Sequence, residues 1–247
     1  MKVKQWMMTI FLILGIFLIF YFLKERFTNS VWNAWNLPLS GRIIYLDAGH
    51  GGVDGGAEHG DAVEKVIALS ITKKLRDYLQ QQGALVLMTR ETDKDLADED
   101  TKGLSRRKVL DLKRRVELIN SSDTDLYISI HLNSIPSSRW RGAQTFYSNR
   151  FIENKIVAEF IQEEFISQLG NTERKAKRIN NIYLLESTKK PGALVEAGFL
   201  SNPEERDLLM DENYQEKIAF AIYSGIMRYF TDEQEKRLEQ EKTKDLE

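Results

Sequence analysis

The hydrophobic positions of the chain are continuous near the N-terminus and become periodic after residue 40. The continuous run, WMMTIFLILGIFLIFYFL at residues 6–23, has no polar face. As a helix rising 1.5 Å per residue it would span about 27 Å, close to the hydrocarbon thickness of a bilayer. No small-x-small cleavage site follows, so the pattern favours an uncleaved signal-anchor over a cleaved signal peptide or a buried core helix. We therefore expect residues 1–27 to bring the chain to a membrane.

Beyond residue 40, short apolar runs alternate with segments whose apolar residues recur every three or four positions. The short runs predict strands and the periodic segments predict helices. The expected strands cover residues 42–48, 84–89, 125–133, 142–148, 182–185 and 193–198. The expected helices cover about residues 62–83, 104–122, 152–169 and 213–230. This alternation predicts a single three-layer α/β domain, with a mostly parallel or mixed central sheet flanked by helices.

Composition sets the remaining boundaries and excludes some functions. Residues 28–40 are polar and contain Pro38, which is typical of a linker, and residues 231–247 form a tail of mixed charge. A formal net charge of −2 argues against a nucleic-acid-binding protein. The chain has no cysteine, so it has no disulfide or thiolate zinc site, and any metal must be held by His, Asp or Glu.

Three ionisable residues lie at the ends of predicted strands. His50 follows the strand over 42–48, His131 is near the end of the strand over 125–133, and Glu196 lies in the strand over 193–198. In open α/β sheets, ligands bind at the carboxyl ends of the strands. We therefore expect His50, His131 and Glu196 to converge on one edge of the sheet.

Two histidines at such an edge indicate a metal site, for which a carboxylate is the usual third ligand. The acidic residues after His50 offer that ligand, and they are Asp54, Glu58, Asp61 and Glu64. Glu64 is favoured because it lies in the first turn of a predicted helix, which fixes the direction of its side chain. An acidic residue in the first turn is also common for a purely structural reason, because it stabilises the helix. Asp54 remains the rival.

A site with two histidines and one glutamate leaves a position open for water, whose pKa zinc lowers towards about 7. Glu196 is then free to accept the proton of the water and pass it to a leaving nitrogen. This is the chemistry of metal-assisted amide hydrolysis, with one Zn²⁺ per chain. His59, in the glycine-rich loop, is expected to be exposed and without a role.

Five motifs carry a family resemblance: LDAGHGGVDGGA, MTRETD, LKRRVELIN, DLYISIHLNS and PGALVEAGFLSNPEE. In this order they resemble the zinc-dependent N-acetylmuramoyl-L-alanine amidases of the amidase type 3 family, over residues 41–230. The resemblance implies that these residues form a zinc amidase catalytic domain. It also implies that His50, Glu64 and His131 bind zinc and that Glu196 is the catalytic acid and base. The substrate it implies is the amide between muramic acid and L-alanine in peptidoglycan.

The segments SIHLNSIPSSRWRGAQTFYSN and AIYSGIMRYF resemble the spore-cortex, germination-associated branch of that family. The resemblance implies that stem peptides are removed from cortex peptidoglycan ahead of muramic-δ-lactam formation by a deacetylase pathway. It also implies a location in the cortex or intermembrane region of a spore-forming bacterium, and the N-terminal apolar run adds the expectation of an exported, membrane-anchored protein. We expect a monomer, with an accessory protein as a further partner.

Three residues are candidates for substrate binding or for support of the site. Asn133 follows the second histidine and is expected to hydrogen-bond substrate, Asp47 to orient a metal ligand from behind, and Arg115 to contact the anionic wall polymer. Each also has an ordinary structural explanation, as a turn residue, a strand end or a solvated helix face. Two other functions remain open: a zinc exopeptidase acting on wall peptides, and a non-catalytic wall-binding protein.

Overall fold

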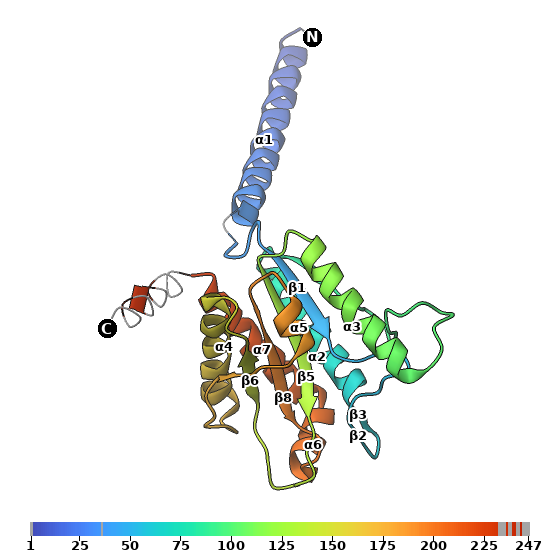
Figure 1. Ribbon diagram of the computed structural model, residues 1–247. Coiled ribbons are helices and arrows are strands. Elements are labelled where there is room, and N and C mark those ends of the chain that lie inside the picture. The colour runs from blue at the N-terminus through green and yellow to red at the C-terminus, as the bar shows by residue number, and fades with distance from the viewer. Residues whose placement is uncertain (1, 36, 232–235, 237–238, 241–242, 244–247) are drawn as a thin grey trace.

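The computed structural model describes residues 2–35, 37–231, 236, 239–240 and 243 (Figure 1). Within these residues the chain forms a long N-terminal helix and one α/β body. Most of the charged tail predicted over residues 231–247 lies outside the described residues.

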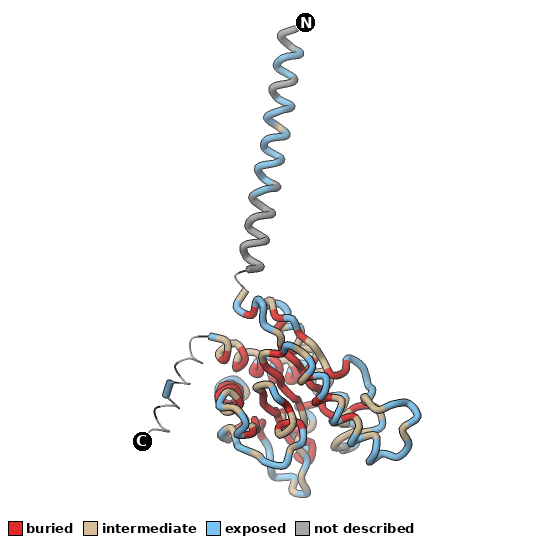
Figure 2. The backbone as a smooth tube through the Cα atoms, turned by 45° about the horizontal axis from the view of Figure 1, so that its top comes forward, coloured by how far each residue is buried: buried red, intermediate tan, exposed pale blue. Residues whose placement is uncertain are grey.

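Helix α1 runs over Lys2–Trp35, so it includes most of the segment that was expected to be a linker over residues 28–40. Among the described residues, one segment is long and apolar enough to cross a membrane, and that segment is Gln5–Phe22, with a mean hydropathy of 2.1 and no buried residue. Figure 2 shows α1 exposed along its described side chains, in contrast to the body. Its length and composition fit either a membrane anchor or a signal sequence.

The body is built on a six-stranded sheet of order β4-β1-β5-β8-β6-β7. The strands are β1 Ile43–Ala48, β4 Leu85–Met88, β5 Leu126–Asn133, β6 Gln144–Tyr147, β7 Lys177–Arg178 and β8 Gly192–Phe199. Only the β6–β8 pair is antiparallel among the strand pairs of this described sheet. The expected mixed, mostly parallel sheet is thus confirmed.

Helices cover both faces of this sheet (Figure 1). One face packs against α2 Glu64–Gln81, α4 Ile152–Glu164 and α7 Glu212–Tyr229, and the other against α3 Leu104–Ser121 and α5 Tyr183–Ser187. A one-turn π-helix over Phe165–Leu169 continues α4. These three layers match the predicted fold class.

Alternation along β1 explains how one strand serves both faces. Ile44 and Leu46 are fully buried in the larger apolar cluster with α2, α4 and α7, whereas Tyr45 belongs to the smaller cluster with α3 and α5. Successive side chains of a strand point to opposite faces, so both layers are anchored on the same six residues. Asp47, the next position on the Tyr45 face, lies at the carboxyl end of the strand, where the functional residues gather.

The prediction of a strand over residues 182–185 is wrong, because this segment begins the short helix α5. Four apolar residues do not distinguish a strand from a helix. Here the backbone N–H of Glu186 donates to the Ile182 carbonyl, and the Thr188 hydroxyl donates to the Leu184 carbonyl, which closes the helical turn.

Smaller elements were also not predicted. Helix α6, Pro203–Met210, begins with a recognisable signal, since the Asn202 side chain caps Glu205 and Pro203 follows directly. The glycine-rich loop contains a small hairpin of β2 Glu58–His59 and β3 Ala62–Val63. Their brevity explains why periodicity did not reveal them.

Candidate metal centre

The site begins at the turn that leaves β1. His50 has a φ of 59°, a left-handed conformation that is uncommon for a residue with a side chain. A Cβ on the preceding Gly49 would lie 2.4 Å from Cε1 of His131, so only glycine lets that imidazole ring pack over the backbone here. The turn and the glycine together bring the two histidine rings to a centroid separation of 5.0 Å.

Glu64 is the first residue of α2 and is 4% exposed. Its Oε2 accepts from the Ala57 backbone N–H at 2.8 Å, and its Oε1 accepts from the Leu132 backbone N–H at 3.0 Å. Burial alone would raise the pKa of this carboxyl, but hydrogen bonds from His131 and His50 outweigh it and hold the pKa well below its usual range. Glu64 is therefore a fixed carboxylate, the form that binds a metal ion.

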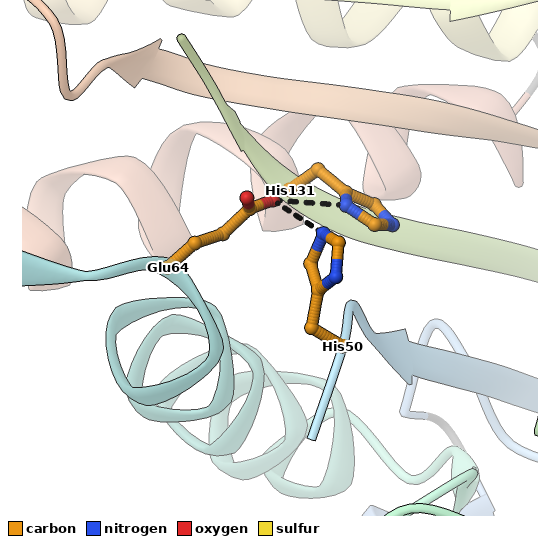
Figure 3. A group of neighbouring side chains, drawn as sticks. All are labelled: His50, Glu64 and His131. Atoms are coloured by element: carbon orange, nitrogen blue, oxygen red, sulfur yellow. Dashed lines mark hydrogen bonds and ion pairs between the residues drawn. The ribbon is translucent and has the colours of Figure 1, made fainter. Parts of the chain in front are cut away.

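Figure 3 shows His50, Glu64 and His131 pointing towards a common centre from the turn after β1, from α2 and from β5. Glu64 Oε1 lies 3.2 Å from His50 Nε2 and 3.0 Å from His131 Nδ1. One ligand atom from each residue falls within 4.8 Å of the others. Two imidazole nitrogens and one carboxylate oxygen at this spacing fit a single divalent metal ion, and zinc in particular accepts this donor set.

Asp54, the rival of Glu64 as third ligand, has a different position. Its Oδ2 lies 2.8 Å from His50 Nδ1, the ring nitrogen that faces away from Glu64. A carboxylate on this nitrogen fixes the tautomer and ring orientation of a metal-binding histidine. Lys108 Nζ lies 3.1 Å from the other oxygen of Asp54. The structure therefore places Asp54 behind His50.

Two buried arginines hold the backbone of this turn. Arg115 is 1% exposed and donates to the carbonyls of Ala48 and His50 at 2.7 and 2.6 Å. Arg90 is equally buried and donates to the Ala48 and Gly49 carbonyls at 3.0 and 2.8 Å. The prediction that Arg115 contacts the wall polymer is wrong, because its guanidinium lies beneath the turn and is closed off from solvent. The sequence around Arg90 is dense in charged residues and gave no sign that its side chain would be buried.

Asp47 supports the turn through Arg115. Its Oδ1 accepts from Arg115 at 2.6 Å and from the Thr89 hydroxyl at 2.8 Å, and its Oδ2 accepts from the Ser129 hydroxyl at 2.6 Å. Burial would raise the pKa of Asp47, but the Arg115 charge and the hydroxyl donors lower it to about 2. Asp47 thus acts on His50 indirectly, by way of Arg115 and the His50 carbonyl.

Replacing Arg115 with methionine should lower the free energy of unfolding by about 3–5 kcal/mol, since it leaves buried carboxylates without their cation. These carboxylates belong to Asp47 and to Asp111, whose Oδ2 accepts from Arg115 Nε at 2.8 Å. Urea unfolding of the purified chain measures the effect. Lys113→Met, on an exposed position of the same helix, should stay within about 0.5 kcal/mol of the parent. Equal midpoints for Arg115→Met and Lys113→Met would contradict the role given to Arg115.

Glu196 lies on β8 directly opposite His131 of β5. Its Oε2 is buried and has no hydrogen-bond partner within the described chain. Burial is the main reason that the pKa of Glu196 rises to about 7, with a further increase from the Glu64 charge. A carboxyl with this pKa exchanges a proton readily near neutral pH, as a general acid and base must.

A cavity of about 370 Å³ opens onto these residues. Its lining includes His50, His131 and Glu196, together with Lys108 of α3. Apolar side chains from α3, the segment before α5, α5 itself and β8 line its walls, and they are Leu112, Ile182, Leu184 and Leu194. Concave sites with a few converging polar groups are the usual form of substrate pockets.

The structure places the remaining candidates away from this cavity. Asn133 ends β5, where its backbone carbonyl accepts from the Leu200 N–H at 2.9 Å, and it does not line the cavity. Hydrogen bonding of Asn133 to substrate stays a prediction. His59 is partly buried and not exposed as expected, and its Nε2 lies 2.9 Å from the Ser134 hydroxyl. That it has no functional role stays a prediction.

The fold and the site define the class of this protein: a three-layer α/β domain with a His/Glu/His cluster that could hold a metal ion and an ionisable glutamate beside it, the combination that metal-dependent amide hydrolysis requires. The chain belongs to the N-acetylmuramoyl-L-alanine amidase family Amidase_3, which it matches over residues 44–228. It is therefore an enzyme of the amidase type 3 family.

Individual relatives agree with this assignment. The chain is 57% identical over 221 residues to the germination-specific N-acetylmuramoyl-L-alanine amidase of Bacillus subtilis (strain 168), covering 89% of this chain and 93% of that protein. The structure of the CwlD amidase from Clostridioides difficile, in complex with the GerS lipoprotein, is similar with a TM-score of 0.75 and 44% identity over 76% of this chain and 98% of that one.

A third relative is the catalytic domain of CwlV, an N-acetylmuramoyl-L-alanine amidase from Bacillus (Paenibacillus) polymyxa var. colistinus. It is similar with a TM-score of 0.66 and 31% identity over 76% of this chain and 97% of that one. The family resemblance carried by the five sequence motifs is confirmed, and so is the resemblance of two further segments to the germination-associated branch.

Proposed function

We propose that this chain is a zinc-dependent amidase that cleaves the bond between N-acetylmuramic acid and L-alanine in spore-cortex peptidoglycan. Removal of the stem peptides would precede muramic-δ-lactam formation. The observation that carries the proposal is the position of Glu196, which lines the cavity together with His50 and His131 of the His50, Glu64 and His131 cluster and has a carboxyl oxygen without a hydrogen-bond partner in the described chain.

His50, Glu64 and His131 would hold the metal ion, because their ligand atoms converge and Glu64 is already ionised. The chemistry that a zinc ion supplies when bound at such a site is polarisation of the scissile carbonyl and acidification of the attacking water. Asp54 keeps the ring of His50 in register by its contact with Nδ1. Arg115 keeps the backbone of His50 in place.

Glu196 moves the proton in this scheme. Its carboxylate accepts a proton from water as the water oxygen forms a bond to the lactyl carbonyl carbon. The carbon–nitrogen bond then breaks, and Glu196 returns the proton to the nitrogen of L-alanine, which leaves as an amine. Burial raises the pKa of Glu196, which helps its carboxyl to hold the proton before passing it to the nitrogen.

The cavity would receive the substrate around the scissile bond. Its apolar wall, formed by Leu112, Ile182, Leu184 and Leu194, suits alkyl groups such as the methyl groups of the lactyl unit and of L-alanine. The cavity is also lined by Glu196, the proposed proton-transferring residue, and by two of the three proposed metal ligands, His50 and His131.

Location and partners form part of the proposal. We infer that α1 tethers an exported enzyme to a membrane, since Gln5–Phe22 has the length and composition of a span. The C. difficile relative forms a complex with a lipoprotein, which supports an accessory protein for this chain as well.

Removing the metal should abolish peptide release, and restoring zinc should recover it. The purified full-length chain, in mild detergent, is treated with a chelator, dialysed, and incubated with cortex peptidoglycan with or without one equivalent of zinc. Mass spectrometry of the soluble fraction should find stem peptides with a free L-alanine amino terminus only in the zinc sample. Metal analysis of the reloaded protein should find one zinc per chain.

Other products would point to the alternative functions. Shortened peptides still attached to the glycan would indicate a zinc exopeptidase. Zinc binding and adherence to peptidoglycan without any soluble product would indicate a wall-binding protein. Full activity in the chelated and dialysed sample would contradict the metal requirement.

A further inference from the structure

A row of polar side chains crosses the sheet from the site towards its β7 edge. Glu196 of β8 is paired with His131 of β5 on one side and with Gln144 of β6 on the other. Figure 1 shows these three strands side by side. Residues directly opposite each other on neighbouring strands point to the same face, so Gln144 lies about 5 Å from Glu196 on the face that carries the cavity.

Gln144 leads to an arginine that is held in a fixed place. Oε1 of Gln144 accepts from Arg174 Nη1 at 3.2 Å, and the Arg141 carbonyl accepts from Arg174 Nη2 at 3.1 Å. The Arg174 guanidinium also stacks 5.0 Å from the ring centroid of Phe199. Both of these hydrogen-bond acceptors are neutral, and the Arg174 charge also acts on the Glu205 carboxyl, whose pKa it pulls down against the effect of burial. Arg174 has five N–H donors, so some of them remain for a ligand.

Trp140 lies beside this arginine in the loop between β5 and β6. Its ring centroid is 5.6 Å from the Arg174 guanidinium and 5.5 Å from that of Arg139, and the side chain is 45% exposed. An exposed indole flanked by two cations makes no contribution to the core. The two guanidinium groups lie over the ring and supply hydrogen-bond donors, and the exposed part of the indole offers an apolar surface.

This combination matches the chemistry of a sugar chain that carries carboxylates. The C–H face of a hexopyranose packs on an aromatic ring, its hydroxyl groups accept hydrogen bonds from guanidinium, and a carboxylate pairs with guanidinium in a bidentate geometry. Amide hydrolysis at the lactyl group itself produces such carboxylates along the glycan. A strand whose muramic acids have already lost their peptides therefore carries the groups that Trp140 and Arg174 are suited to bind.

We propose that Trp140, Arg139 and Arg174 form a subsite for the glycan strand next to the muramoyl residue being cleaved. Trp140 stacks on a sugar ring, and Arg174 pairs with the lactyl carboxylate of a residue already stripped of its peptide. The inference rests on the proposed amidase function, and Gln144 connects the subsite to Glu196. Such a subsite would favour continued cleavage along one strand.

Binding to peptide-free glycan strands tests the subsite without any amide hydrolysis. The full-length chain in mild detergent is compared with Trp140→Ala, and with Phe220→Ala as a matched control because that aromatic residue is 42% exposed on α7, on the other face of the sheet. Trp140→Ala should weaken binding about tenfold, the effect of one lost aromatic contact of about 1.4 kcal/mol, and Phe220→Ala should not change it. Equal affinities for Trp140→Ala and the parent would overturn the proposal.

The role of Arg174 is tested with two ligands, strands with free lactyl carboxylates and strands in which these are converted to amides. The parent should prefer the carboxylate form, and Arg174→Gln should lose most of that preference, whereas an unchanged preference would overturn the carboxylate pairing. Peptide release is assayed separately. If neither the parent nor any variant releases peptides, the proposed amidase function fails. If Trp140→Ala still loses glycan binding in that case, the subsite stands.

Discussion

Replacing Glu196 with glutamine should lower the rate of peptide release by about 10²–10⁴-fold, the usual contribution of a general acid and base. Glutamine preserves the shape of the side chain but neither accepts nor returns the proton. The three proposed metal ligands are untouched, so the variant should keep one zinc per chain. Release of stem peptides from cortex peptidoglycan, together with metal analysis of the same sample, measures both quantities.

The control for this substitution is Glu212→Gln, at an exposed position of α7, which should retain parental activity and metal content. Substantial activity in Glu196→Gln would mean that another residue transfers the proton. Loss of the metal from this variant would mean that Glu196 is a ligand, contrary to the assignment made here.

Replacing His131 with alanine should remove both the metal and the activity. Loss of a residue that only hydrogen-bonds to a metal ligand already costs about 10- to 100-fold in metal affinity. Loss of a direct ligand should therefore weaken zinc binding by more than about 100-fold. Competition with a chromogenic chelator measures the affinity. His59→Ala is the matched control because His59 contacts Ser134 and lies outside the cluster, and it should bind zinc as the parent does.

The variant Asp54→Asn tests whether Asp54 binds the metal itself or only orients a metal ligand. Because Asp54 contacts His50 Nδ1 and not the convergence point of the cluster, this variant should lose about 10- to 100-fold in zinc affinity and stay metal-dependent. A loss as large as that of His131→Ala would make Asp54 a ligand. Parental zinc affinity in His131→Ala would refute the ligand set.

The sheet and the edge at which the site forms were predictable because strand periodicity and strand ends are local properties of the sequence. The apolar run before His50 and the one around Glu196 each became a strand of the parallel part of the sheet, and the carboxyl ends met as topology requires. Preference for Glu64 over Asp54 rested on a helix fixing the direction of its first residue, and Glu64 does point at both histidines. The family resemblance agreed with that preference.

The rest of the site depends on tertiary contacts that periodicity does not encode. Several arginines of α3 look alike in the sequence, and only packing against the β1 turn decides that Arg115 is the buried one. Arg90 follows a strand in a segment dense with charge, and its burial results from carbonyl acceptors contributed by distant residues. The prediction of a strand where helix α5 lies was wrong for a related reason. The four apolar residues of this segment fit either structure, and the packing of Leu184 is a tertiary contact that periodicity does not encode.

The left-handed turn at His50 also has a consequence for how the enzyme is loaded. Its backbone carbonyls are bound by the guanidinium groups of Arg115 and Arg90, and Glu64 is fixed by two backbone N–H donors, so the cluster is held by contacts that need no ion. Small zinc domains fold only when metal arrives, because the ion itself supplies the folding energy. Here a core covering both faces of a six-stranded sheet supplies it. We therefore expect the chain to fold without the metal, and under the proposed function zinc would bind by mass action to a site already in place.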